Sequence, residues 1–215
     1  MTDPHQSEPT VAGGASLSDA SAAVVLVHGR GATARSILQM AHEFRRDGVA
    51  YLAPQAANNT WYPNSFLAPV ESNEPGRSSG LQRLDGIIAE VNDAGIPTER
   101  VLVGGFSQGA CLATEFVARN PTKYGGLAAL SGGLIGESID PDAYEGNLQG
   151  TPAFLGCSNV DPHIPEQRVH ETATVLERLG ADVDTRIYPN MTHTVNEDEL
   201  TAVAAMLDSI LDGSS

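Results

Sequence analysis

Residues 101–120, VLVGGFSQGACLATEFVARN, decide the fold of this chain. The segment opens with a short apolar run of the kind that forms a strand buried on both faces of a parallel sheet. From Gln108 onward, Leu112, Phe116 and Val117 recur at helical spacing. Between the two lies a Gly-x-Ser-x-Gly sequence centred on Ser107. The segment therefore predicts a strand, a tight turn that presents a serine, and a helix.

The same alternation of apolar runs and helical patterns extends outward in both directions. Strands are predicted at Ala23–His28, Gly48–Pro54, Arg100–Phe106, Gly126–Ser131, Pro152–Cys157 and Val183–Tyr188. Helices are predicted at Thr33–Arg46, Leu81–Ala94, Gln108–Asn120, Glu166–Leu179 and Glu197–Leu211. This alternation predicts an α/β fold with a mostly parallel central sheet of about six to seven strands and helices on both faces. Polar and apolar residues alternate in the last strand, which indicates an edge strand.

The chain is long enough for one domain with a sizeable core, and we interpret residues 21–212 as that domain. Residues 1–20 are rich in small and acidic residues without periodicity, so we expect a disordered tail there. No apolar run is long enough to span a membrane, and the acidic start lacks the apolar core of a secretory signal. Two long loops, 55–79 and 132–151, are candidates for function.

Charge is the most unusual feature of the composition. The chain has 27 acidic residues against 12 basic ones, a net charge of −15, and Lys123 is its single lysine. This balance argues against nucleic acids and anionic membranes as partners, because both need clustered positive charge. An acidic, lysine-poor surface is typical of proteins from a salt-rich (halophilic) cytoplasm, so we expect stability and activity to rise with salt. Cys111 and Cys157 lie in apolar runs, which indicates buried, reduced thiols and a cytoplasmic location.

The turn at residues 105–109 predicts a nucleophilic serine. Glycine on both sides of Ser107 removes the Cβ atoms that would collide with neighbouring backbone in a tight, strained turn. The turn would expose the Ser107 hydroxyl above the carboxyl edge of the sheet. It would also place the serine at a helix N-terminus, where the helix dipole favours developing negative charge. A serine hydroxyl is a poor nucleophile without a base, so the chain must supply one.

His193 is the base that this arrangement predicts, and Asp161 is the carboxylate expected to orient it. His193 lies between the last predicted strand and the last predicted helix, and Asp161 closely follows a predicted strand. The chain order serine, acid, histidine is typical of a catalytic triad built on a strand–turn–helix serine. Asp140 and Asp142 lie in the same interval, but no strand precedes them, so we interpret them as solvated turn acids.

The stretch His28-Gly29-Arg30-Gly31, at the end of the first predicted strand, predicts one half of an oxyanion hole. A backbone amide there can face the serine turn, and the residue after the nucleophile supplies a second amide. We therefore expect the backbone amides of Arg30 and Gln108 to be the donors. The His28 side chain is expected to be buried at the strand end and bonded to nearby backbone.

Apolar side chains near this sheet edge are candidates for the substrate pocket. Those predicted to bind substrate are Trp61, Tyr62, Phe66, Leu134 and Ile164. The Arg30 side chain would recognise an acidic substrate group if it faced the cleft, and the sequence leaves its direction open. This interpretation of the site uses no metal and no cofactor.

With these pieces in order, the chain resembles the phospholipase/carboxylesterase family, the acyl-protein-thioesterase-like branch of the α/β hydrolases. The resemblance rests on VVLVHGRGA at 24–32, GGFSQGACLA at 104–113, DPHIP at 161–165 and MTHTV at 191–195. It implies an α/β-hydrolase fold without a large cap domain, no metal, esterase activity on short or medium acyl chains, and frequent dimerisation. Arg30 and Ala32 depart from the Leu and Asp that members acting on acylated proteins commonly have.

The sequence thus predicts a serine hydrolase, a carboxylesterase that cleaves esters of short or medium acyl chains through Ser107, Asp161 and His193 and an acyl-enzyme. The expected partner is a small-molecule ester, and homodimerisation is left open. Thioesterase and lysophospholipase activities are alternatives. A catalytically inactive binding protein on the same scaffold is a further alternative. Such a protein would be expected to have lost a triad residue or a glycine of the turn, and this sequence retains all of them.

Overall fold

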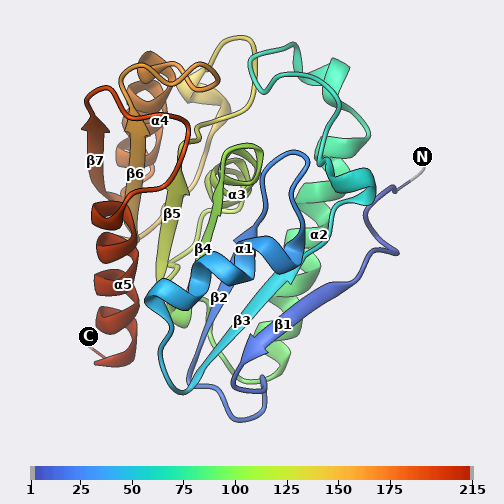
Figure 1. The fold of residues 1–215 in the computed structure, drawn as a ribbon, viewed down its shortest axis with the longest axis vertical. Helices are drawn as coiled ribbons and strands as arrows, with labels where there is room; N and C mark the ends of the chain where they lie inside the picture. The colour runs from blue at the N-terminus through green and yellow to red at the C-terminus, as the bar shows by residue number, and fades with distance from the viewer. Residues whose placement is uncertain (1–2, 214–215) are drawn as a thin grey trace.

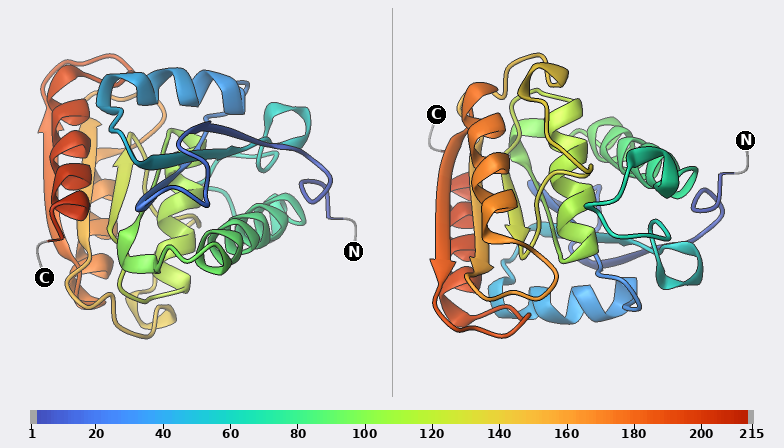
Figure 2. Two further views of the ribbon diagram at one scale, coloured as in Figure 1. Left: turned by 90° about the horizontal axis from the view of Figure 1, so that it is seen from below. Right: turned by 90° about the horizontal axis from the view of Figure 1, so that it is seen from above.

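The computed structural model describes residues 3–213, which build one seven-stranded sheet with helices on both faces (Figures 1 and 2). The strand order is β1-β3-β2-β4-β5-β6-β7. β1 pairs with β3 in antiparallel fashion, and all other pairs are parallel. The strands are β1 (Thr10–Gly14), β2 (Ala22–Val27), β3 (Val49–Pro54), β4 (Val101–Phe106), β5 (Gly126–Leu130), β6 (Pro152–Ser158) and β7 (Asp182–Tyr188).

Five helices of residues 3–213 cover the sheet, α1 and α5 on one face and α2, α3 and α4 on the other (Figure 1). They are α1 (Ala34–Met40), α2 (Gly76–Asp93), α3 (Gln108–Arg119), α4 (Glu166–Arg178) and α5 (Glu197–Leu211). Short 3-10 turns lie at Ala41–Phe44, Ala57–Asn59, Val70–Asn73, Thr98–Arg100 and Pro141–Ala143. Within residues 3–213, no helix is long and apolar enough to cross a membrane.

The predicted α/β fold is confirmed, and the apolar runs account for it. β2, β3 and β5 are buried along their whole length, because helices cover both faces of the sheet. β7 lies at an edge of the sheet, as its alternating sequence predicted. Cys111 and Cys157 are free thiols and both are buried, as expected from their apolar neighbours.

The N-terminal segment is not the disordered tail that the sequence predicted. Thr10–Gly14 forms β1, which pairs with the edge of β3 along its whole length. His5 is buried, and its Nε2 lies 2.9 Å from the carbonyl oxygen of Trp61. The prediction failed because the pairing comes from the free edge of β3 and not from the β1 sequence itself. Residues 1 and 2 of the predicted tail lie outside the described residues.

Helix α2 begins earlier than predicted, at Gly76 and not at Leu81. Two glycines in its first turns lie against Trp61. A Cβ built on Gly76 would lie 2.5 Å from the Trp61 carbonyl oxygen, and one built on Gly80 would lie 3.3 Å from the Trp61 ring. These glycines therefore permit close packing of Trp61 against the helix, although glycine is more typical of loops than of helices.

Helix α5 starts with a capping box that also fixes a buried carboxylate. The Asn196 side chain accepts a hydrogen bond from the Glu199 amide, and Glu199 Oε2 accepts one from the Asn196 amide at 2.8 Å. Glu199 lies against β6, where a Cβ built on Gly156 would come within 2.3 Å of Oε1. Oε1 has no hydrogen-bond partner in the described part of the chain. Burial raises the pKa of Glu199 to about 7.

Candidate active site

Ser107 stands at the turn between β4 and α3 in a backbone conformation that few residues adopt. Its φ and ψ are 56° and −121°, and its amide donates a hydrogen bond to the Leu130 carbonyl oxygen at 3.0 Å. A Cβ built on Gly105 would lie 2.6 Å from the Val27 carbonyl oxygen, and one built on Gly109 would lie 2.0 Å from the same atom. Both flanking glycines are therefore required by the close approach of β2 to the turn.

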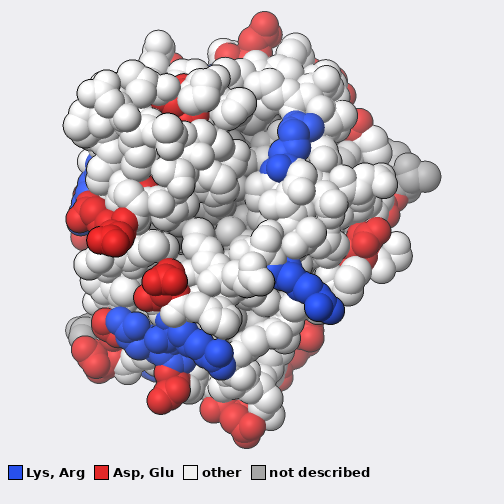
Figure 3. Space-filling view, viewed as in Figure 1, with Lys and Arg blue, Asp and Glu red and all other residues white. Residues whose placement is uncertain are grey.

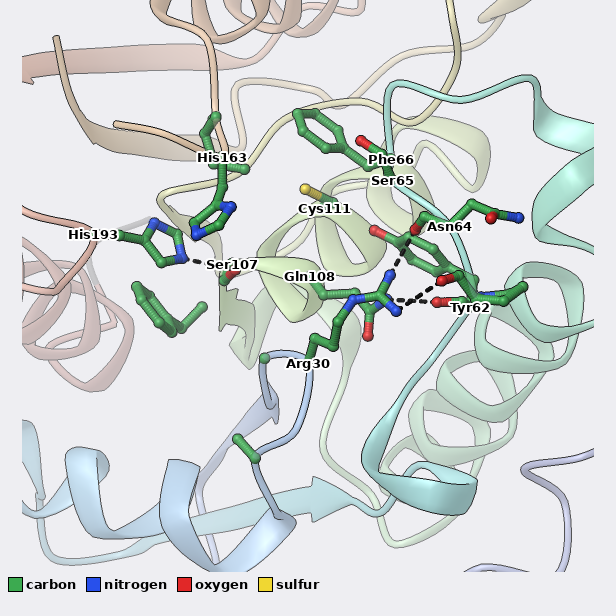
Figure 4. Close-up of a pocket in the computed structure, with 15 residues that line it drawn as sticks. Arg30, Tyr62, Asn64, Ser65, Phe66, Ser107, Gln108, Cys111, His163 and His193 are labelled. Carbon is green, nitrogen blue, oxygen red and sulfur yellow. Dashed lines mark hydrogen bonds between the residues drawn. The ribbon is translucent and has the colours of Figure 1, made fainter. Parts of the chain in front are cut away.

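Three side chains from three separate loops form one continuous hydrogen-bonded chain. Ser107 Oγ lies 2.9 Å from His193 Nε2, a contact drawn in Figure 4, and His193 Nδ1 lies 2.7 Å from Asp161 Oδ2. Asp161 follows β6, and His193 lies between β7 and α5. The carboxyl ends of parallel strands meet at one edge of the sheet, so residues distant in sequence come together there. Such a chain can move a proton from a serine hydroxyl to an imidazole.

Asp161 is held as a carboxylate under His193. Its side chain is fully buried, and Oδ1 accepts hydrogen bonds from the amides of His163 and Ile164 at 2.8 and 3.0 Å. Burial by itself raises the pKa of Asp161, but the hydrogen bonds from His193 and from the two amides outweigh it. The net effect lowers the pKa from its ordinary value, which keeps the group ionised.

The two other acidic candidates lie elsewhere. Asp140 caps the short turn that follows it and accepts a hydrogen bond from the Asp142 amide. Asp142 is exposed and pairs with Arg178 of α4. Both groups are surface turn acids, as the sequence indicated.

The imidazole of His193 is enclosed by two rings that sequence reasoning did not place in the site. The Phe106 ring is 4.9 Å from it, and the His163 ring is 4.9 Å away in an edge-on arrangement. Phe106 precedes Ser107, and His163 follows Asp161 by two positions. Their closeness in sequence to Ser107 and Asp161 was a sign that these two rings could lie in the site. The direction in which each ring points depends on the fold.

Arg30 and Gln108, the expected oxyanion-hole residues, both attach their side chains to the loop after β3. The Arg30 guanidinium donates to the carbonyl oxygens of Pro63 and Asn64 at 2.9 and 2.6 Å (Figure 4). Gln108 Oε1 accepts from the Trp61 amide and its Nε2 donates to the Tyr62 carbonyl oxygen, both at 2.9 Å. Within the described residues, the backbone amides of Arg30 and Gln108 donate to no other backbone group.

Ser107 opens onto a cavity of about 470 Å³. Tyr62, Phe66 and Ile164, three of the side chains predicted to bind substrate, line it. The wall also includes residues that the sequence did not point to: Asn64, Ser65, Phe106, Cys111 and His163. Figure 3 shows the corresponding face of the molecule with a central hollow bordered mainly by uncharged side chains. The volume lies within the range of small-molecule sites.

Trp61 and Leu134 do not line this cavity, so that part of the pocket prediction is wrong. Trp61 is fully buried, and its indole N–H donates to the His28 carbonyl oxygen at 2.9 Å, behind the cavity wall. Leu134 is fully buried in the core beside α4, and its amide donates to the Thr172 hydroxyl. Both side chains are buried away from the cavity, a position that an apolar residue in a loop does not reveal in sequence.

His28 has the structural role that the sequence predicted. It is fully buried, its Nδ1 lies 2.8 Å from the Gly29 carbonyl oxygen, and its Nε2 accepts a hydrogen bond from the Ala56 amide at 3.1 Å. Burial lowers the pKa of His28, so the ring is held neutral with its proton on Nδ1. The ring thus joins the ends of β2 and β3.

Comparison with known proteins gives one consistent result. The model of the phospholipase/carboxylesterase family matches residues 15–211. A crystal structure of a phospholipase/carboxylesterase from Dyadobacter fermentans superposes with a TM-score of 0.90 at 42% identity, covering 95% of this chain and 97% of that one. Acyl-protein thioesterase 1 of Debaryomyces hansenii is 27% identical over 94% of this chain and 97% of its own length. The crystal structure of esterase PE8, at 23% identity and a TM-score of 0.75, shares the fold over 95% of this chain and 98% of its own.

Proposed function

The chain belongs to the phospholipase/carboxylesterase family and is a hydrolase of the ester- and thioester-cleaving kind, and on that premise we propose that it hydrolyses carboxylic esters of short or medium acyl chains through an acyl-enzyme on Ser107. The observation that carries the proposal is the chain of contacts from Ser107 Oγ through His193 to the buried Asp161 carboxylate. It lies at the mouth of a cavity of about 470 Å³, a volume suited to an acyl group of that length.

The first half-reaction forms the acyl-enzyme. His193 Nε2 accepts the Ser107 proton as Oγ attacks the ester carbonyl carbon. The amides of Arg30 and Gln108 donate hydrogen bonds to the resulting oxyanion, and the N-terminus of α3 favours its charge. The carbon–oxygen bond to the alcohol then breaks, and His193 donates its proton to the leaving oxygen. Asp161 stabilises the imidazolium that exists between these two proton transfers.

The second half-reaction clears the acyl group. A water molecule donates a proton to His193 Nε2 and its oxygen attacks the acyl carbonyl carbon, through a second oxyanion held by the same two amides. The bond to Ser107 Oγ breaks, His193 returns the proton to Oγ, and the carboxylic acid leaves. The phenyl ring of Phe106 and the buried Asp161 keep the imidazole oriented throughout both halves.

Ser107→Ala tests the proposal. We expect hydrolysis of 4-nitrophenyl butyrate to fall by at least about a thousandfold, because the nucleophile is removed, while the melting temperature stays close to that of the parent. Ser209→Ala, on the exposed face of α5, is the matched control and should keep full activity. A fluorophosphonate should label the parent and not Ser107→Ala. Retained turnover in Ser107→Ala would contradict the assignment, and absent labelling of the parent would favour an inactive binding protein.

A thioester is the second candidate substrate, and the relatives named acyl-protein thioesterase favour it. The same residues serve both reactions, but a thiolate leaves more readily than an alkoxide and depends less on proton donation by His193. A chain-length series run in parallel on esters and thioesters, with a lysophospholipid included, decides between them by the ratio of kcat/KM values.

A further inference from the structure

Arg30 differs from most arginines of this chain in the surroundings of its guanidinium. Within the described part of the chain, six arginines pair with a carboxylate: Arg46, Arg77, Arg119, Arg168, Arg178 and Arg186. Arg30 pairs with no carboxylate of residues 3–213. Its two hydrogen bonds go to main-chain carbonyl oxygens of the loop at residues 63–64, and they use only part of its donors. The loop thus fixes the position of a cation without neutralising it.

This cation belongs to the cavity beside Ser107. Arg30 is among the lining residues, and no Asp or Glu of the described chain is. Asp161 is fully buried beneath His193, with both oxygens engaged in hydrogen bonds. A fixed guanidinium that faces a cavity without a counter-ion is notable in a chain of net charge −15, because acidic side chains are plentiful elsewhere. Guanidinium donors match the planar geometry of a carboxylate.

The position of Arg30 relative to His193 indicates which part of the substrate the guanidinium would contact. In Figure 4 the guanidinium lies between Ser107 and residues Tyr62 and Asn64, on the side of Ser107 opposite His193. His193 protonates the leaving oxygen in the proposed mechanism, so the leaving group lies on its side and the acyl group extends towards Arg30. We propose that the Arg30 guanidinium binds a carboxylate at the far end of the acyl group, which makes monoesters or monothioesters of dicarboxylic acids the preferred substrates. This inference rests on the proposed function of Ser107.

The test compares two 4-nitrophenyl esters of adipic acid, one with a free terminal carboxylate and one with that carboxylate as its methyl ester. Adipate is long enough to limit attack of its carboxylate on its own ester. The measured quantity is the ratio of kcat/KM for the acid to kcat/KM for the methyl ester. We expect Arg30→Gln to lower this ratio about tenfold, the usual effect of losing one charge-assisted hydrogen bond. Arg30→Lys, which keeps the charge, should restore part of it.

Arg35→Gln is the matched control, because Arg35 is an exposed arginine on α1 that does not line the cavity. Its ratio should equal that of the parent, and an equal loss in both variants would show a general charge effect and overturn the proposal. An unchanged ratio in Arg30→Gln would also overturn it. A butyrate ester whose carboxylate lies on the nitrophenol leaving group tests whether Arg30 binds the acyl side or the leaving-group side of the substrate. If Arg30→Gln slows that ester as much as the adipate ester, the acyl-side placement is wrong.

A measurement on the parent protein alone keeps the proposal testable if Arg30→Gln does not fold. Adipate should inhibit hydrolysis of the neutral methyl ester at least about tenfold more strongly than dimethyl adipate does, and equal inhibition would contradict carboxylate binding. Failure here is distinct from failure of the proposed function. Retained turnover in Ser107→Ala removes the serine mechanism, whereas Ser107-dependent turnover with no preference for the acid removes only the role of Arg30.

Discussion

Glu199 makes stability depend on pH in a direction opposite to most carboxylates. Its pKa is raised by burial from 4.5 to about 7, and one of its oxygens has no hydrogen-bond partner in the described part of the chain. The folded state therefore binds this proton more tightly than the unfolded state. The resulting stability is fully present below pH 4.5 and is lost as the pH rises through about 7. The lowered pKa of Asp161 acts below its ordinary value of 3.8, outside this window.

Glu199→Gln should remove this pH dependence. We expect the parent to lose on the order of 2–3 kcal/mol of unfolding free energy between pH 4.5 and 8 through this group, and the variant to lose that much less. The measurement is urea unfolding at several pH values. Glu197→Gln, an exposed neighbour in the same helical turn, is the control and should follow the parent curve. Parallel curves for the parent and Glu199→Gln would show that Glu199 ionises freely in the fold.

At the residue scale, the sequence identified the reactive side chains more accurately than the side chains that pack around them. Ser107, Asp161 and His193 could be named because each carries a reactive group at a fixed place in a strand–loop–helix order. Trp61 was wrongly assigned to the pocket lining, because a tryptophan in a loop after a strand is equally compatible with lining the pocket and with packing behind its wall. His163 was missed as a neighbour of His193, since its direction depends on how Asp161 binds the His163 amide.

At the scale of elements, β1 closes one edge of the sheet, and it depends on one glycine. Gly14 has φ 75°, and a Cβ there would lie 2.3 Å from the Val49 carbonyl oxygen, whereas a Cβ on Gly13 would meet nothing within 4 Å. The two residues are adjacent in β1 and pair with neighbouring positions of β3, Ala50 and Tyr51. They therefore form a matched pair for testing how firmly this strand is held.

Gly14→Ala should loosen β1, and Gly13→Ala should not. We expect Gly14→Ala to lower the free energy of unfolding by about 1–3 kcal/mol, through the clash and the unfavourable φ. Amide hydrogen exchange in residues 10–14 and 49–54 should speed up in that variant alone. Equal exchange rates in the two variants would mean that the strand tolerates a shift at Gly14 without losing its pairing.

The elements that could be predicted are those whose own residues determine whether the element is buried or exposed. Strands β2 to β6 are apolar runs, and each of their ends was predicted to within one residue, because polar or turn residues follow them. The start of α2 and the whole of β1 could not be found. Gly76 and Gly80 of α2 are small because Trp61 packs on them, and β1 is ordered by the open edge of β3. Both depend on partners that lie far away in the chain.

For the whole molecule, the acidic charge lies apart from the cavity. Acidic side chains gather towards the margins of the face in Figure 3, and no carboxylate within residues 3–213 lines the cavity. The acidic residues behind the net charge of −15 therefore lie outside the cavity lining. At low ionic strength such a surface repels itself, and at about 1 M salt the screening length falls to roughly 3 Å.

We therefore expect salt to stabilise the protein. Raising KCl from about 0.1 M to about 2 M, where screening is nearly complete, should raise the melting temperature by about 5 °C, the shift that roughly 2 kcal/mol gives in a chain of this size. Activity on a neutral ester should rise with it. Sorbitol at matched osmolality is the control for solvent exclusion and should give a smaller shift. A melting temperature that falls in KCl would contradict a surface adapted to salt.

The way Arg30 and Gln108 hold one loop bears on how this protein could acquire a new specificity. Each residue offers a backbone amide to the proposed oxyanion and a side chain to residues 61–64. The recognition loop and the catalytic apparatus are therefore not independent modules. A loop grafted from a relative would bring altered turnover along with altered preference, unless compatible partners at positions 30 and 108 were transplanted with it. Gradual divergence by paired changes is the accessible evolutionary route for this pocket.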